Sequence, residues 1–415
     1  MAKLAGFILL AGVFFQMPAA KADQYHYLNI LVGERAMGLG GAFTAVADDA
    51  SGVVYNPAGI AFALSNDISG SANAFYRRKV VYKKALGDKD FVENSGGSTA
   101  PFFGGLQKLD NYVEGASFAF GIYNLDSELK DQNDIIENQS ALGLQRFHRT
   151  TNIRASTTGF AGALAKRIGN NFALGFGLAF ITIDELMQEY QDVNYTSGRF
   201  LTQNSRILLG AQAIEPSIGF QWTVGSWAFG ANVRYRSILS SSYESDIDLS
   251  QNFDTNGSVR NPIKIQRSIL QTEAMKTMPA VGRIGMAWFY STRLLWTADV
   301  IHYTAAEGDV FDREAVTNFA SGLEYYITPS VPVRVGLFTN NDARPELEEG
   351  KLGQAEHIDY NGASLFFALV QPNSQVALGA IYQLGTGKAQ KTSNVAIQDV
   401  EAESMTVAFS ATHSF

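Results

Sequence analysis

Bulky apolar residues alternate with small or polar residues along most of the chain. At the carboxyl end, Met405, Val407 and Phe409 share one parity, and the residues between them are small or hydroxylic. A β-strand places two such sets on opposite faces. The same alternation recurs in residues 172–180, 214–222, 227–236, 283–290 and 375–384. Because it recurs with small or polar residues on the second face, it indicates a barrel with lipid outside and a filled lumen.

Short and long connections alternate between these segments. Short turns are expected at residues 109–111, 169–170, 225–226, 291–292, 328–330 and 372–373. Long polar loops are expected near 85–97, 126–153, 184–209, 241–278, 304–314, 341–356 and 387–401. Bacterial barrels have short periplasmic turns and longer outer loops. We therefore predict an all-β fold, a 14-stranded antiparallel transmembrane β-barrel with both chain ends on the short-turn side. The second strand, Thr99 to Lys108, is placed partly by this alternation.

The amino terminus has the layout of a secretory signal peptide. Lys3 precedes an apolar run over residues 4–15, and Ala20-Lys21-Ala22 forms a small-residue cleavage pattern. Such a run is too short to span a bilayer. We predict that residues 1–22 are a signal peptide and that the mature chain, with no long apolar run, has no transmembrane helix. The expected location is the bacterial outer membrane.

Composition narrows the function classes. Only 17% of residues are charged, against about 25% in an ordinary soluble protein. The net charge of -8 argues against a nucleic-acid partner. The absence of cysteine excludes disulfides and thiolate chemistry. The five histidines are scattered and form no catalytic pattern. We therefore expect no enzymatic activity, no cofactor and no metal site.

Residues 23–66 do not follow the strand pattern that begins at residue 67. They contain a glycine-rich block that lacks the last glycine of a dinucleotide fingerprint and is not followed by the Lys-Ser/Thr pair of a phosphate-binding loop. The segment is compact and rich in small residues, so we expect a hatch that fills the lumen of a barrel formed by residues 67–415.

This block resembles the amino-terminal hatch signature of the FadL/TodX superfamily, outer-membrane transporters of long-chain fatty acids and aromatic hydrocarbons. The spelling from Gly33 through Arg35 to Gly41 is at least as similar to the PorV-like branch, whose members are shuttle or anchor proteins for type IX secretion. The residues that match the hatch motif are Gly38, Gly40, Gly41, Asn56, Pro57, Ala58 and Gly59.

The resemblance implies that a hydrophobic molecule binds in the barrel, shifts the hatch and leaves sideways through the wall into the bilayer. Its implied partners are a hydrophobic small-molecule ligand, outer-membrane lipid and lipopolysaccharide, and the barrel is expected to be a monomer. Two alternatives stay open. The protein is a PorV-like secretion partner or another outer-membrane binding protein, with secreted proteins as its partners, or it is a general porin.

Strand parity also predicts which side chains face the lumen. An arginine among them would hold a fatty-acid carboxylate through charge-assisted hydrogen bonds. The alternative is that these charges pair with one another or hold the hatch. The candidate ligand-binding residues are Arg234, Arg236, Arg283, Phe289, Arg334, Phe338 and Phe367.

Overall fold

The computed structural model describes residues 25–86, 89–139, 143–254, 257–307, 312–351, 354–391 and 396–415. The predicted signal peptide lies outside these residues. Three short helices come first, α1 (Glu34–Gly38), α2 (Gly52–Tyr55) and the 3-10 helix η2 (Pro57–Phe62). The strands that follow are β1 (Asp67–Leu86), β2 (Lys89–Lys108), β3 (Ala116–Gln139), β4 (Leu144–Ile168), β5 (Phe172–Tyr195), β6 (Phe200–Val224), β7 (Trp227–Tyr235), β8 (Ser237–Phe253), β9 (Val259–Thr272), β10 (Ala280–Ser291), β11 (Leu294–Tyr303), β12 (Val316–Thr328), β13 (Val331–Asn340), β14 (His357–Gln371), β15 (Ser374–Ala389) and β16 (Gln398–Ser414).

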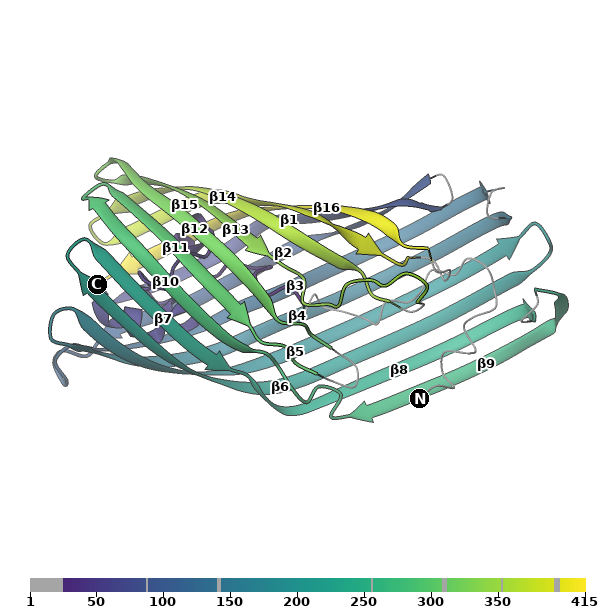
Figure 1. The fold of residues 1–415 in the computed structure, drawn as a ribbon, viewed down its shortest axis with the longest axis horizontal. Coiled ribbons are helices and arrows are strands. Elements are labelled where there is room, and N and C mark those ends of the chain that lie inside the picture. Colours follow the sequence, from purple (N-terminus) through teal and green to yellow (C-terminus); the bar gives the residue numbers. More distant parts are fainter. Residues whose placement is uncertain are drawn as a thin grey trace.

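The strands form one closed antiparallel barrel (Figure 1). Most strands pair with their neighbours in the sequence. Strand β1 also pairs with β16, from Asp67 opposite Ser414 onward, which closes the sheet. Where the ladder is closed, every strand has a neighbour on both sides. A bilayer requires this, because no water is present there to satisfy unpaired backbone groups.

The sixteen hydrogen-bonded strands make fourteen wall strands. One irregular residue, Arg236, separates β7 from β8, and both pair with the same long strand β6. In the same way β9 pairs with β8 while β10 pairs with β7, so β9 and β10 are two parts of one wall strand. The prediction of a 14-stranded antiparallel barrel is confirmed.

The wall is much longer on one side than on the other. Strands β3 to β6 have 24 or 25 residues each, whereas β11 and β13 have 10. We call the end with the short connections the turn end and the opposite end the hairpin end. The expectation of long loops is wrong for much of residues 85–97, 126–153, 184–209 and 241–278, because the strands continue through these polar segments and meet in hairpins.

The alternation of inward and outward side chains agrees with the sequence pattern. In β5, Leu174, Phe176 and Leu178 are exposed on the outer face, and the alanines and glycines between them are buried. One parity assignment was wrong. In β14 the buried residue is Phe366, and Phe367 is 51% exposed on the outside. Three consecutive bulky residues, Leu365 to Phe367, made both phases compatible with the sequence.

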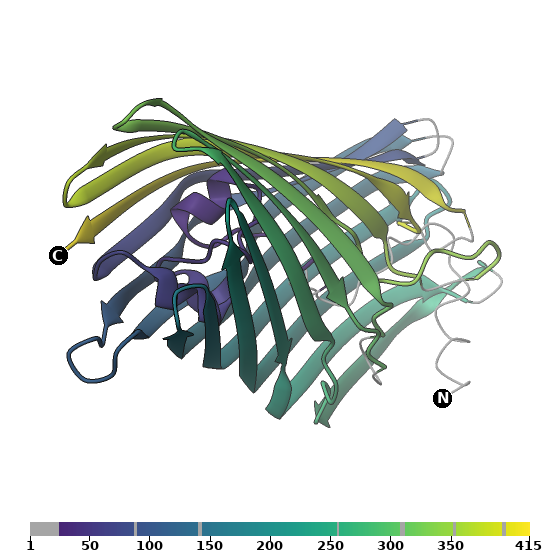
Figure 2. The same cartoon turned by 60° about the vertical axis from the view of Figure 1, so that its left-hand side comes forward.

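Residues 25–66, which we call the inner segment, lie inside the barrel (Figure 2). Most of their side chains are buried, and they pack against inward residues of the wall. In Figure 2 their purple ribbon occupies the half of the lumen nearer the carboxyl terminus, which is the turn end. None of the described helices is long and apolar enough to cross a membrane.

Candidate functional site

The inner segment fits against a track of glycines on the inner wall. Gly175 and Gly219 face Pro57 and Ala58, Gly230 faces Thr44, and Gly336 faces Gly40. A Cβ atom at any of these wall glycines would overlap the backbone or side chain of the inner segment. The sequence uses glycine at inward wall positions because two backbones approach each other closely there.

Asn56 ties the inner segment together and to the wall. Its amide nitrogen donates to the carbonyl of Thr44 at 2.8 Å and to the carbonyl of Phe220 on β6 at 2.9 Å. Its amide oxygen accepts from the backbone of Ala58 at 3.1 Å and caps η2. Pro57 then occupies the first position of η2, where its missing N–H costs nothing. The Asn-Pro-Ala motif is thus a helix cap that also binds a wall carbonyl.

The glycine-rich block forms a tight turn after α1. Gly40 and Gly41 have φ values of 64° and 85°, which side chains with a Cβ rarely adopt. Gly38 has an ordinary backbone but lies against the Arg334 side chain. These three glycines therefore shape the loop that contacts β13 and β14.

Five ionic groups hold this loop against the wall. Arg35 of α1 binds Glu324 of β12 with two hydrogen bonds of 3.1 and 3.2 Å and also binds Asp48 at 2.8 Å. Arg334 of β13 binds the same Glu324 at 2.5 Å and also Glu34 of α1. These side chains link α1, β12 and β13 through bonds of the strong, charge-assisted kind.

A second buried carboxylate receives the following turn. Asp299 of β11 accepts hydrogen bonds from the backbone of Phe43 at 3.1 Å, the backbone of Thr44 at 3.0 Å and the Thr44 hydroxyl at 2.6 Å. The inner segment is therefore attached at several points to strands on different sides of the lumen.

A small cavity of about 70 Å³ lies between the amino-terminal part of the inner segment and the wall; we call it the middle pocket. The Tyr27 ring stacks on Tyr303 of β11, with ring centroids 4.1 Å apart. Arg234 and Arg236 line one side and bind Glu215 at 3.5 and 2.8 Å. The other lining residues are His26, Leu125, Asp126, Thr157, Ile183, Met278, Pro279 and Val281. The pocket combines apolar walls with a few fixed charges, which is typical of small-molecule sites.

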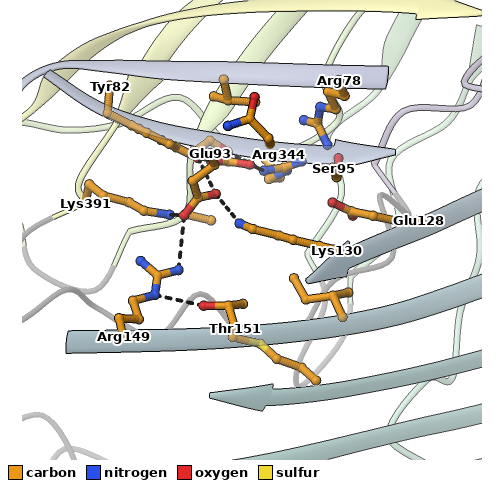
Figure 3. Close-up of a pocket in the computed structure, with 16 residues that line it drawn as sticks. Arg78, Tyr82, Glu93, Ser95, Glu128, Lys130, Arg149, Thr151, Arg344 and Lys391 are labelled. Atoms are coloured by element: carbon orange, nitrogen blue, oxygen red, sulfur yellow. Dashed lines mark hydrogen bonds and ion pairs between the residues drawn. The ribbon is translucent and has the colours of Figure 1, made fainter. Parts of the chain in front are cut away.

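A second cavity of about 70 Å³, the outer pocket, lies toward the hairpin end and is strongly charged (Figure 3). Its centre is Glu93 of β2. The Glu93 carboxylate binds Lys130 of β3 at 2.7 Å, Arg149 of β4 at 3.1 Å and Lys391, after β15, at 2.7 Å. Arg149 also binds Glu189 of β5 at 3.0 Å. One carboxylate thus connects three other parts of the wall.

The surroundings shift the pKa values of two ionisable groups of this pocket, Lys391 and Glu356. Burial lowers the pKa of the Lys391 ammonium, and Arg149 and Lys130 lower it further, while Glu93 acts in the opposite direction. Burial alone would raise the pKa of the Glu356 carboxyl, but Arg344 and Lys391 hold it below its usual value. The cations around Glu356 therefore favour its ionised form.

The wall beside the outer pocket has a seam. Strands β2 and β3 are paired only from Phe102 opposite Tyr123 to Lys108 opposite Ser117. Beyond Pro101, which lacks an N–H to donate, the described residues of β2 have no ladder partner on β3. The Gln132 side chain bridges the gap instead, accepting from the backbone of Asn94 and donating to the carbonyl of Val92, both at 2.9 Å.

The predicted lumen residues fall into three groups. Arg234 and Arg236 line the middle pocket. Arg334 holds α1, Arg283 lies over the Tyr55 ring at 5.2 Å, and Phe338 is buried beside Met37, so these three contact the inner segment. Arg234 also donates to the carbonyl of Val54 at 3.1 Å. Phe289 lies near the turn end and is 42% exposed, and Phe367 faces outward; neither lines a described cavity of the lumen.

Sequence reasoning missed the outer pocket. Glu93, Lys130, Arg149 and Lys391 lie in segments that the sequence assigned to loops or to polar faces. One sequence signal could have indicated these residues. Each charged residue lies where two kinds of side chain alternate, which is compatible with a strand that continues beyond the membrane.

Comparisons with known proteins support the fold. No family model matches the chain, and no curated protein matches it. Among solved structures, a FadL homologue from Pseudomonas aeruginosa matches with 13% identity and a TM-score of 0.62, covering 98% of this chain and 100% of that chain. The P. putida toluene transporter TodX matches with 11% identity, a TM-score of 0.61 and coverage of 93% and 99%. The Ralstonia pickettii toluene transporter TbuX matches with 11% identity, a TM-score of 0.56 and coverage of 93% and 99%. The chain shares the complete fold of these proteins.

Proposed function

We propose that this protein is a FadL/TodX-type barrel of the bacterial outer membrane that transports hydrophobic compounds of the fatty-acid or hydrocarbon class. The turn end faces the periplasm and the hairpin end faces the outside, as in bacterial barrels generally. The inner segment acts as the hatch. The proposal is supported by the shared fold, by the toluene transporters among the similar structures and by the hatch motif.

The observation that carries the proposal is the position of the middle pocket. Its wall includes Tyr27 of the inner segment, so a ligand that enlarges the pocket must act directly on the hatch. Each CH₂ group buried there contributes about 0.8 kcal/mol. A long alkyl chain therefore carries enough binding energy to displace a few hydrogen bonds of the hatch.

The β2–β3 seam is the exit that we propose. The seven paired residues of β2 cover about 23 Å along the strand, or about 18 Å of height at a tilt of about 40°. The apolar band of a barrel is about 25 Å tall, so the seam begins inside the hydrocarbon layer. A ligand that parts the side chains across it enters the bilayer without crossing water.

Uptake tests the proposal. A deletion strain that carries the wild-type gene should take up labelled fatty acid or toluene. The same strain with Val281→Trp, which fills the middle pocket, should lose most of this uptake. Val300→Trp on the adjacent strand faces outward and is the matched control. Equal uptake by both variants, or no uptake by the wild type, would refute transport through this pocket.

Cross-linking tests the exit. The chain has no cysteine, so Val92→Cys with Gln132→Cys introduces the only pair, and a short bifunctional maleimide should then tie β2 to β3. We expect this cross-link to stop uptake and to leave ligand binding by the purified protein unchanged. Thr386→Cys with Glu401→Cys, directly opposite on the paired strands β15 and β16, is the control. Normal uptake after complete cross-linking of the first pair would exclude the seam.

The alternative function, a PorV-like secretion partner, rests on the amino-acid sequence of the glycine-rich block. It expects secreted proteins to co-purify with the barrel after mild extraction. Because the described contacts of that block are with the barrel wall and with the rest of the inner segment, we favour the transport proposal.

A further inference from the structure

The hairpin formed by β8 and β9 ends in an open sheet edge. Strand β9 pairs with β8 from Ser242 opposite Thr272 to Phe253 opposite Val259. It is the last strand in the order of the sheet, and no described strand pairs with its other side. Figure 1 shows it at the lower border of the barrel, with β8 on one side and no labelled strand on the other. An unpaired edge of this kind offers a row of free N–H and C=O groups.

The edge is open because the wall beside it is short. Strand β11 follows β9 and β10 in the chain, but its last residue, Tyr303, is already opposite Val281 at the start of β10. No described strand on that side of the wall reaches as far as β9. From Ile263 to Thr272, ten residues project beyond the neighbouring strand, which is about 33 Å of edge.

The side chains of β9 are almost all exposed, although several are apolar. Ile263 is 49% exposed and Leu270 is 70% exposed. The strand carries three cations, Arg260, Lys264 and Arg267, and no carboxylate. Arg260 pairs with Asp254. For Lys264 and Arg267, the described part of the chain contains no ion pair.

These charges decide what the edge can accept. A second copy of β9 would bring its own cations against Lys264 and Arg267, and like charges on adjacent strands are destabilising. Pro262, which cannot donate to a ladder, adds to this protection against self-association. An acidic strand gains both the backbone ladder and opposite-charge pairs.

We propose that β9 is a docking strand for an extended, acidic segment of a partner protein outside the cell. The segment adds to the sheet by strand addition, in which the backbone supplies affinity and the side chains supply specificity. Lys264 and Arg267 lie on opposite faces of the strand, because they are three residues apart. Carboxylates of the added segment therefore pair with Arg267 while its apolar residues cover Leu270. One residue out of register, they pair with Lys264 while its apolar residues cover Ile263. This binding surface lies outside the lumen and is independent of the proposed transport.

A peptide of alternating valine and glutamate, ten residues long, is the probe, and the full chain in lipid nanodiscs is the receptor. We expect this peptide to bind at least tenfold tighter than its lysine counterpart and than an acidic peptide interrupted by prolines. It should also slow hydrogen exchange of the amides in residues 263–272. Equal binding of the proline peptide, or binding without protection of these amides, would show simple charge attraction and overturn the proposal.

The double variant Lys264→Glu with Arg267→Glu tests the charges. It should bind the acidic peptide at least tenfold more weakly and the lysine peptide more tightly, a reversal that a misfolded barrel would not produce. Lys89→Glu, an exposed lysine at the tip of the β1–β2 hairpin, is the control and should change neither value. Unchanged preference in the double variant would refute the role of the two cations.

The full chain in membranes or nanodiscs also tests two other occupants of the edge, a second copy of the chain and lipopolysaccharide. If Gln266→Cys forms a disulfide dimer in membranes, the edge belongs to a second copy. If lipopolysaccharide in the nanodisc protects residues 263–272 and the acidic peptide does not, the cations serve a glycolipid headgroup. Either result would overturn the proposal.

Discussion

The turn-end half and the hairpin-end half of this barrel are held together by different kinds of contact. At the turn end every wall strand is hydrogen-bonded to its neighbours, and the inner segment fits against glycines of the wall. At the hairpin end the ladder between β2 and β3 stops, and side chains such as Glu93 and Gln132 connect the strands. Backbone hydrogen bonds therefore join all the strands at the turn end. At the hairpin end, side-chain contacts that a substitution can remove join β2 to β3.

This difference has a physical reason. In hydrocarbon an unpaired backbone group costs several kcal/mol, so each one there needs a partner. Where the seam begins, side chains such as Gln132 supply these partners. Beyond the bilayer water satisfies the backbone, so an open edge is tolerated there. A barrel that must open sideways or present an edge can do so only where its ladder gives way to water or to side chains.

The largest expected effect comes from Glu93→Gln. The change leaves Lys130, Arg149 and Lys391 packed together without their shared carboxylate, and breaking a mostly buried ion pair costs about 3–5 kcal/mol. We expect hydrogen exchange in the outer part of β2 to accelerate by about a hundredfold or more, since about 1.4 kcal/mol is tenfold. The amides of the inner segment should keep their rates.

Glu403→Gln is the control for this variant. Glu403 pairs with Lys79 at 3.8 Å, and both side chains are exposed, so the cost should stay below about 1 kcal/mol. If the two glutamine variants were alike, the outer pocket would not hold the hairpin end together.

The sequence predicts the turn end far better than the hairpin end. Lipid requires apolar residues on one face, so period-two alternation identifies β5 and β16 directly. In polar segments such as residues 126–153 the apolar residues are too few to show the alternation, so the sequence predicts loops where the strands continue. The contacts of Glu93 join residues up to 298 positions apart, from Glu93 to Lys391, and no local pattern encodes them. In the hatch motif, Asn56 and the glycines were recognisable, but their partners Phe220 and Gly219 were not.

A smaller effect is expected when the glycine track is filled. In Gly219→Val the new side chain would overlap Asn56 and crowd Pro57 and Ala58, and such overpacking costs about 1–3 kcal/mol. The inner segment should detach more often, and ion conductance in planar bilayers should rise. Gly282→Val, where an added Cβ meets nothing within 4 Å, is the control. Equal conductance of the two variants would mean that the track does not seat the inner segment.

The smallest effect isolates the seam itself. Gln132→Ala removes the two side-chain hydrogen bonds that replace the missing ladder between β2 and β3. Each is worth about 0.5–1.5 kcal/mol net, so the amides near Val92 and Asn94 should exchange roughly tenfold faster. The same change at Gln188, an exposed residue of β5 that is paired on both sides, should leave its neighbours unchanged. If the two variants behaved alike, the outer parts of β2 and β3 would be joined by their backbones after all, and the two halves of the barrel would be built in the same way.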